Sequence, residues 1–365
     1  MNIHKIYKSL YPVVFVNRNQ LLVYKKGSFY SLNLETCNLV HIVKFKLKFY
    51  TYIISFIPLL VRIFRLTIRA SVKYDKEGLL IFSFQKKIYE MNLKTFKISK
   101  GFDLIHSRPL NFEIIHGITG IEDGVYFGEY KSNPQKKPIS IYKRCGVDNW
   151  RVVYTFNQGE IEHVHNIISD RINDMVYILT GDFGNGAAIW SVKNNFNLIE
   201  VILKGDQNYR SCIAFPTTEG LVYATDSPFT NNSIRLLHKN DHSGWVSSEI
   251  LKINGPCIYG AKFNNDLIFS TSVEGEGSSS NFIYNLFSIK RGSGIVDDFV
   301  CVYKGNINTG FNLIYKSKKD KLPYLLFQFG AIVFPIGIIQ GDYLPMFEIG
   351  TCNYNMSTVV FKNNI

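Results

Sequence analysis

Two histidines separated by one residue, His163 and His165, are the pair whose type and spacing most directly predict chemistry in this sequence. On a strand, the period of two places both imidazoles on one side while Val164 points into the sheet. Such a pair can act as a general base with its orienting partner, or as two ligands of a divalent metal ion. No spacing in the sequence matches a standard zinc signature. A purely structural, hydrogen-bonded role therefore stays open beside the other two.

Three carboxylates, Glu129, Asp182 and Asp226, follow successive predicted strands at matching places. They would be available to complete an acid-base site or a metal site beside the histidines. We predict catalytic roles for Glu129 and Asp182 together with His163 and His165, and a substrate-binding role for Asp226. Acids at the same place in each repeat can instead cap their own backbone turns, above all Asp226, which precedes Ser-Pro.

Tyr209 and Arg210 begin the next predicted first strand and could complete a binding site. The guanidinium fork suits a carboxylate, sulfate or phosphate group, and the phenol can stack on a sugar or donate to it. We predict that both residues bind substrate. The alternative is that Arg210 pairs with an acidic residue of its own repeat.

These residues belong to a repeat with a period of roughly 50 residues, which is typical of propeller blades. Each copy begins with a polar turn and an apolar run ending in an aromatic residue: Asn19-Gln20 before LLVY, Glu77-Gly78 before LLIF, Asp123-Gly124 before VYF, Asn173-Asp174 before MVY, Glu219-Gly220 before LVY, Asn265-Asp266 before LIF, and Asp320-Lys321 before LPY. Alternating segments such as NLFSIK (285–290) and FVCVY (299–303) supply the predicted third and fourth strands.

The repeat predicts one all-β domain over residues 1–365, a propeller of about seven four-stranded blades. Six blades remain open because the last unit, 309–350, is weakly patterned and could complete the first blade. A β-sandwich or barrel is the alternative architecture. Aromatic residues at one point of the second strands should pack between blades, namely Tyr126, Tyr177, Tyr223 and Phe269. Six scattered cysteines without a CxxC pair indicate reduced thiols of the core.

Residues 44–73 form an insertion, and basic residues concentrate in this part of the chain. Residues 1–75 carry +10 of the net charge of +12. The uncharged stretch 49–60 is too short to span a bilayer and contains Pro58. After it, the spacing of Arg62, Arg65 and Arg69 predicts one face of an amphipathic helix. This helix could contact an anionic membrane surface, or pack on the propeller and leave its arginines solvated.

The rest of the chain is nearly neutral, which argues against a nucleic-acid partner. Pro12 and Arg18 interrupt the N-terminal apolar stretch, so we expect no secretory signal there. The predicted location is the cytoplasm, peripheral to the inner face of the membrane if the basic helix binds lipid.

The turns before Trp150, Phe196, Trp245 and Phe299 resemble in placement the Asp-box repeats of sialidase-like (BNR) propellers, although KRCGVDNW keeps only the closing Trp. The stretch 108–237, with FGEY, GEIEHVHNI, TGD, NYRS and TDSP, is similar to uncharacterised propellers that accompany surface-polysaccharide biosynthesis. Sialidases hold the substrate carboxylate with three arginines. Only Arg108 and Arg210 fall on first strands here, so exo-sialidase activity is not expected.

Two functional hypotheses follow from the residues and the resemblance. The first is a glycan-directed propeller that binds or acts on an acidic saccharide or a lipid-linked sugar precursor, with hydrolysis, lysis and transfer all open. It requires no cofactor apart from a divalent metal ion that His163 and His165 could hold. The second is a non-catalytic scaffold that docks to membrane-bound polysaccharide assembly enzymes.

Overall fold

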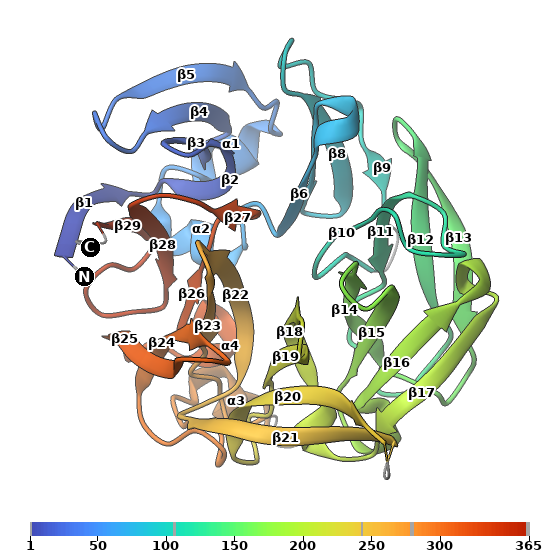
Figure 1. Cartoon of the computed structure of the whole chain (residues 1–365). Helices are drawn as coiled ribbons and strands as arrows, with labels where there is room; N and C mark the ends of the chain where they lie inside the picture. Colours follow the sequence, from blue (N-terminus) through green and yellow to red (C-terminus); the bar gives the residue numbers. More distant parts are fainter. Residues whose placement is uncertain (1, 105–106, 242–243, 278–280, 363–365) are drawn as a thin grey trace. The chain divides into compact units, whose positions relative to one another are not determined.

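The computed structural model describes residues 2–104, 107–241, 244–277 and 281–362. Its strands form seven sheets, each with four antiparallel strands (Figure 1). The predicted fold class, an all-β propeller of seven four-stranded blades, is therefore confirmed. The chain forms two compact units: unit 1 contains Met1–Ile68, Pro228–Asn231 and Ile253–Ile365, and unit 2 contains Arg69–Ser227 and Asn232–Lys252.

Unit 2 contains four blades that follow one another in the chain. The first consists of β6 (Ala70–Tyr74), β7 (Leu79–Phe84), β8 (Lys87–Asn92) and β9 (Phe102–Asp103), and the second of β10 (Glu113–Ile115), β11 (Gly124–Gly128), β12 (Ile139–Gly146) and β13 (Asn149–Phe156). The third consists of β14 (His163–Asp170), β15 (Met175–Gly181), β16 (Ala188–Lys193) and β17 (Leu198–Lys204), and the fourth of β18 (Ser211–Thr217), β19 (Gly220–Thr225), β20 (Asn232–Asn240) and β21 (Gly244–Ile253).

Aromatic residues of the second strands fill the spaces between these blades. Tyr126 on β11, Tyr177 on β15 and Tyr223 on β19 are all fully buried, as the repeat predicts. Their hydroxyl groups still find partners: Tyr126 Oη donates to the carbonyl of Glu122 at 2.6 Å, and Tyr223 Oη to that of Asn208 at 2.7 Å. The rings supply apolar contact without leaving a buried polar group unsatisfied.

Unit 1 contains the other three blades. One consists of β2 (Tyr11–Asn17), β3 (Gln20–Lys25), β4 (Ser28–Asn33) and β5 (Leu39–Lys44). The next consists of β22 (Cys257–Phe263), β23 (Asp266–Thr271), β24 (Phe299–Asn306) and β25 (Gly310–Lys318), with the short β27 (Ile338–Ile339) added parallel to β22. Phe269 on β23 is fully buried, as predicted.

The last blade is assembled from both ends of the chain. Its strands are β26 (Ala331–Val333), β28 (Tyr343–Ile349), β29 (Ser357–Lys362) and β1 (Asn2–Lys8). Strand β1 pairs with β29 in antiparallel register from Asn2 opposite Lys362 to Lys8 opposite Ser357. This pairing satisfies the edge of β29 with residues more than 300 positions away in the sequence, and it gives the seventh blade its fourth strand.

Two segments of unit 1 differ from the prediction. Asp320-Lys321 precedes the short helix α4 (Tyr324–Phe327), and the second strand of that blade is β28 instead. NLFSIK overlaps α3 (Phe282–Phe287), so FVCVY belongs to the third strand, β24, and not to a fourth strand. Both errors have one cause, because a short apolar run does not distinguish a strand from a helical turn.

The insertion after β5 forms two short helices, α1 (Phe49–Ile54) and α2 (Pro58–Ile63). Among the described residues, no helix has the length and apolar character needed to cross a membrane. The predicted helix after Pro58 is present as α2 but is shorter than predicted, because α2 ends at Ile63 and Arg65 has a positive φ of 54° that interrupts helical geometry. Arg62, Arg65 and Arg69 therefore do not share one helical face. A membrane contact through them stays a prediction.

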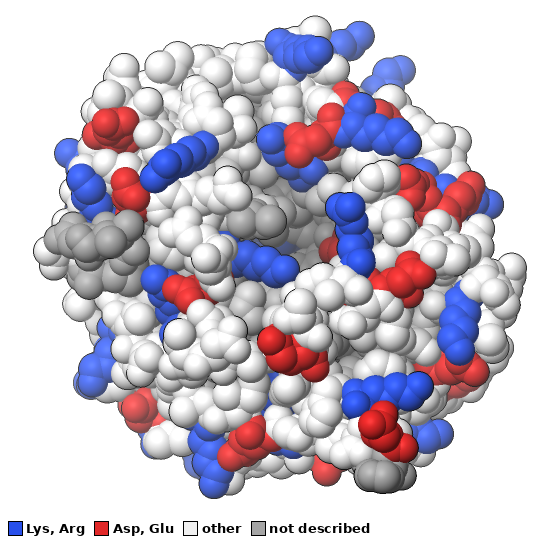
Figure 2. All heavy atoms as spheres, in the orientation of Figure 1, with Lys and Arg blue, Asp and Glu red and all other residues white. Residues whose placement is uncertain are grey.

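Arg62 is buried and forms an ion pair instead of facing solvent. Its guanidinium donates to the carboxylate of Asp320, and its Nη2 lies 3.4 Å from the carbonyl oxygen of Gln328. Lys319 Nζ lies 2.6 Å from the same carboxylate. On the face drawn in Figure 2, basic and acidic side chains are interspersed. Part of the positive charge of the insertion is thus neutralised inside the fold, where Arg62 pairs with Asp320.

The six cysteines differ in burial, and Cys37 is half-buried. Cys212, Cys257 and Cys301 are buried thiols, as predicted. Cys145 and Cys352 are exposed, so the prediction that all six lie in the core is wrong for these two. Strands alternate between buried and exposed positions, and a cysteine's type alone does not say which it occupies.

We predict that Arg62→Met destabilises the protein markedly. Loss of Arg62 breaks a buried ion pair and leaves the Asp320 carboxylate with Lys319 as its remaining cation, and breaking a buried pair costs up to about 3–5 kcal/mol in comparable cases. Arg65→Met is the control, because Arg65 is exposed and surface substitutions usually change stability by about 0.5 kcal/mol or less. Urea unfolding measures both. Equal stabilities for the two variants would contradict the assigned role of Arg62.

The stability should also depend on pH through Asp320. Burial raises the pKa of its carboxyl, but hydrogen bonds from Arg62 and Lys319 outweigh burial and lower that pKa below its ordinary value. The stabilisation is therefore present above the pKa of about 3.9 in the unfolded chain and is lost as the pH falls through the lower folded value. We expect the free energy of unfolding to fall more steeply below about pH 4 in the wild type than in Asp320→Asn. Parallel slopes would show that this carboxylate is not the titrating group.

Candidate functional site

The two predicted histidines lie at the beginning of β14, beside the end of β15. His163 pairs with Gly181, the last residue of β15, so Asp182 follows at the same edge of the sheet. The two imidazoles lie on one side with Nε2 atoms 3.0 Å apart, as the spacing predicts, and Val164 packs in the core between blades. Both histidines are nevertheless buried. They do not form an open acid-base pair.

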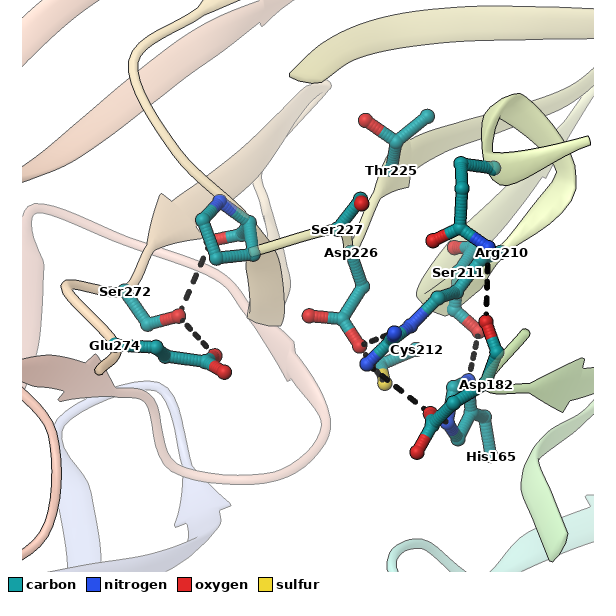
Figure 3. Close-up of polar contacts among 12 residues, drawn as sticks. His165, Asp182, Arg210, Ser211, Cys212, Thr225, Asp226, Ser227, Ser272 and Glu274 are labelled. Carbon is teal, nitrogen blue, oxygen red and sulfur yellow. Dashed lines mark hydrogen bonds and ion pairs between the residues drawn. The ribbon is translucent and has the colours of Figure 1, made fainter. Parts of the chain in front are cut away.

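Residues of the next blade, β18–β21, lie beside the two histidines. Arg210 directly precedes β18, and Asp226 directly follows β19; Ser211 pairs with Thr225 between these strands. Because the first and second strands of a blade are antiparallel, the start of one and the end of the other lie at one edge. This edge of β18 and β19 faces the corresponding edge of β14 and β15 (Figure 3).

Asp182 is the centre of this cluster. Its Oδ1 atom lies 3.3 Å from His163 Nε2, 3.2 Å from His165 Nε2 and 3.0 Å from Arg210 Nη2. Arg210 Nε lies 3.5 Å from Asp226 Oδ2, so the guanidinium stands between two carboxylates (Figure 3). The alternative interpretation of Arg210, pairing with an acidic residue of its own repeat, is thereby realised with Asp226. A second acid, Asp182, comes from the preceding blade.

Burial is the largest influence on the titration of these groups. It raises the pKa of the Asp182 carboxyl, but hydrogen bonds to His163 and His165 and the charge of Arg210 outweigh it and hold that pKa far below its ordinary value. Burial lowers the pKa of His165 to about 4. Burial and the nearby Asp226 raise the pKa of Cys212. Near neutral pH the cluster therefore holds an ionised Asp182, an uncharged His165 and a protonated Cys212.

A glycine makes the close approach of His165 possible. A Cβ atom added to Gly181 would lie 2.2 Å from His165 Cε1 and 2.5 Å from His165 Nε2, far inside van der Waals contact. By comparison, a Cβ at Gly146 on β12 would have no atom within 4 Å. The imidazole thus occupies the space that any other side chain at position 181 would need.

The side chains of two predicted site residues are directed away from the cluster. The Glu129 carbonyl accepts from the Val164 amide at 3.0 Å, so its backbone borders the histidines, but its carboxylate accepts hydrogen bonds from the Ser107 hydroxyl at 3.0 Å and the Ser140 amide at 2.9 Å. Tyr209 packs into the apolar core between the third and fourth blades of unit 2. The position of a residue in the repeat does not show where its side chain points, because a turn residue can face either neighbouring blade.

The prediction missed four residues that contribute to the cluster, two by their side chains and two by their backbone carbonyls. Cys212 Sγ lies 3.2 Å from Asp226 Oδ2, and the ring of Tyr130 lies 4.4 Å from that of His163. The backbone carbonyls of Lys131 and Ser211 accept from the two histidines. Cys212 stands two residues after Arg210 and could have been noticed there, but nothing in the sequence marks a carbonyl contact.

A separate pocket of about 790 Å³ lies near the opposite end of β15, between the third and fourth blades of unit 2. The residues that line it are Asn173, Met175, Tyr177, Ser191, Lys193, Glu200, Val201, Ile202, Thr218, Glu219, Gly220, His238, Lys239 and Trp245. None of the predicted site residues is among them. Trp245 is half-buried, packs against the core between these blades and contributes to this pocket.

Comparison with known proteins supports the fold and no narrower assignment. No protein-family model matches the sequence, and no curated protein matches it. Among solved structures, the AfRom2 CNH domain has a TM-score of 0.53 at 7% identity, covering 100% of this chain and 96% of that one. The Cps50 (Swd1) β-propeller domain of Myceliophteria thermophila has a TM-score of 0.55 at 10% identity, with 96% of both chains covered.

A chain in the crystal structure of the Mitotic Checkpoint Complex is also similar, with a TM-score of 0.53 at 7% identity over 99% of this chain and 94% of that one. Identities this low show a shared propeller fold only. The sialidase-like resemblance and the link to polysaccharide biosynthesis stay predictions.

We predict that Gly181→Ala destabilises the protein, because the new methyl group would displace the His165 imidazole. Overpacking of this kind costs about 1–3 kcal/mol. Gly146→Ala is the matched control, since it adds the same methyl group to open space and should be nearly neutral. Thermal and urea unfolding of the two variants test this. Equal losses would mean that the close packing of Gly181 and His165 is not present in solution.

Proposed function

We propose that this chain is a non-catalytic binding propeller that holds a partner polypeptide in the pocket between the β14–β17 and β18–β21 blades. The observation that carries the proposal is the placement of polar groups. Of the residues expected to perform catalysis, His163 and His165 are buried and both contact the half-buried Asp182, and the Glu129 carboxylate is bonded to Ser107 and Ser140. The pocket lies apart from them and opens between two blades.

The cluster offers little for acid-base chemistry on a saccharide. Glycoside hydrolysis needs two carboxyl groups that flank the sugar, one to donate a proton and one to act as base or nucleophile. Here Asp182 and Asp226 both contact Arg210, and Asp182 also contacts both histidines. A guanidinium already shared by two carboxylates is a weak receptor for a third anion. The acidic-saccharide hypothesis therefore has less support than polypeptide binding.

The pocket has the composition of a protein-binding surface. Met175, Val201 and Ile202 supply aliphatic contacts and Trp245 supplies an aromatic one. Lysine and glutamate side chains are both present around them, namely Lys193, Lys239, Glu200 and Glu219. An apolar centre with a mixed polar rim is typical of protein interfaces. An acidic saccharide would meet the two glutamates as well as the lysines.

The outer strand β17 extends this apolar character to the surface. Leu198 is 40% exposed and Val201 is 39% exposed on that strand. Val201 also lines the pocket, so an exposed aliphatic side chain is available to a partner there. A propeller of the same fold in the Mitotic Checkpoint Complex is found in an assembly of proteins, which is consistent with such a role.

Selection from a phage-displayed peptide library tests the proposal. We expect the selected peptides to bind Val201→Lys at least about tenfold more weakly than the wild type, the effect of losing one apolar anchor worth about 1.4 kcal/mol or more. Val152→Lys is the matched control. Val152 is an exposed valine on β13, the fourth strand of the neighbouring blade, and its replacement should leave binding unchanged.

Other outcomes would count against polypeptide binding in this pocket. Failure to enrich any peptide, or equal binding to the wild type and Val201→Lys, would exclude the pocket as the contact. Binding of acidic oligosaccharides that is lost in Arg210→Gln would favour the saccharide hypothesis.

A further inference from the structure

Backbone carbonyl groups determine which nitrogen of each clustered histidine carries a hydrogen. His163 Nδ1 lies 3.0 Å from the carbonyl oxygen of Lys131, and His165 Nδ1 lies 3.0 Å from that of Ser211. A carbonyl oxygen can only accept, so each Nδ1 must donate. In an uncharged imidazole the other nitrogen, Nε2, then carries no hydrogen and presents a lone pair.

The two Nε2 atoms and one carboxylate oxygen form a triangle of acceptors. The Nε2 atoms are 3.0 Å apart, and Asp182 Oδ1 lies 3.3 Å from that of His163 and 3.2 Å from that of His165. Three lone pairs at these separations repel one another unless a positive charge lies among them. Arg210 Nη2 lies 3.0 Å from Asp182 Oδ1 and neutralises that corner, but the two Nε2 atoms, 3.0 Å apart, still require an additional proton on one imidazole or a metal ion.

We propose that His163, His165 and Asp182 bind a divalent transition-metal cation through Nε2, Nε2 and Oδ1. Metal–ligand bonds of about 2.0–2.1 Å place neighbouring ligand atoms roughly 3.0 Å apart at right angles and roughly 3.3–3.4 Å apart in a tetrahedron. The three observed separations fall between these geometries. Two imidazoles and one carboxylate suit zinc and its first-row neighbours, whereas magnesium and calcium prefer oxygen ligands.

The surroundings of the three ligand atoms suit a cation. Metal-binding histidines typically donate their other ring N–H to a carbonyl or carboxylate, as both histidines do here. Arg210 Nη2 contacts Asp182 Oδ1 and would orient that carboxylate. With Asp226 included, two carboxylates face one guanidinium, which leaves a net negative charge beside the histidines.

A second group of ligand-type residues, His165, Cys212 and Asp226, overlaps the first. It is a weaker candidate because the Cys212 thiol is directed at Asp226 Oδ2 at 3.2 Å and His165 Nδ1 is directed at the Ser211 carbonyl. The one nitrogen of His165 that is not held by a carbonyl points toward His163 and Asp182. The shared histidine therefore belongs to the first group.

Titration of the chelator-treated full chain with Zn²⁺ tests the site. We expect one equivalent to bind by calorimetry and the melting midpoint to rise with Zn²⁺ concentration, because a ligand that binds the folded state stabilises it. His163→Gln and Asp182→Asn should each weaken binding by more than about 100-fold, the upper range for the loss of an outer-sphere partner. His116→Gln is the control, since exposed His116 also pairs with an aspartate, Asp123, but lies outside the cluster.

Titration with Co²⁺ gives a readout that needs no variant. A visible absorption band that appears with one equivalent of Co²⁺ and disappears on addition of Zn²⁺ would support a specific site, even if the buried variants fail to fold. Absence of binding by either metal to the wild type would overturn the proposal and leave a proton as the charge in the triangle. Affinity unchanged in His163→Gln and Asp182→Asn, or lost in His116→Gln, would overturn it as well.

Discussion

A four-stranded sheet with two apolar faces can bury both only against other sheets, and this constraint shapes each unit of the structure. In unit 2, buried tyrosines at one point of the second strands fill the space between successive blades. In unit 1, one apolar cluster joins residues of all three blades. Large rings at a repeated position give each sheet the same spacing from its neighbours, so a repeated sequence yields a repeated interface.

Close packing between blades also determines where polar groups must find partners. The first and second strands of two adjacent blades meet at one edge. The side chains buried or half-buried there are His165, Asp182, Arg210 and Asp226. A buried charge without a partner is costly, so these groups satisfy one another across the blade boundary. The same requirement explains Arg62, which reaches Asp320 inside unit 1 instead of facing solvent. The presence of a charged residue in the sequence therefore does not by itself indicate a solvent-exposed binding surface in this chain.

The proposed binding pocket and the proposed metal site lie at different ends of the same pair of blades. The cluster lies at the end of β15 that carries Gly181, whereas the pocket is lined by Met175 and Tyr177 from the other end. A cation held by His163, His165 and Asp182 would connect β14 to the segment after β15, and Arg210 would extend this connection to β18. Such a connection would hold the two blades together while leaving the pocket between them available to a partner.

The sequence alone determined the features that depend on local pattern. Alternation and turn residues predicted seven blades, the aromatic core and the shared side of His163 and His165, because strand periodicity follows directly from backbone geometry. For Arg210 the sequence left open whether it binds a ligand or pairs with an acid of its own repeat.

Only tertiary structure decided the remaining features. The seventh blade takes β1 from the opposite end of the chain, and neither strand carries a sign of its partner. The shared position of Asp182 between two histidines and Arg210 depends on how neighbouring blades pack, as do the directions of the Glu129 carboxylate and the Tyr209 ring. Burial of Arg62 likewise depends on Asp320, 258 residues away in the sequence. Long-range contacts of this kind arise from packing between sheets, and a local sequence pattern contains no information about them.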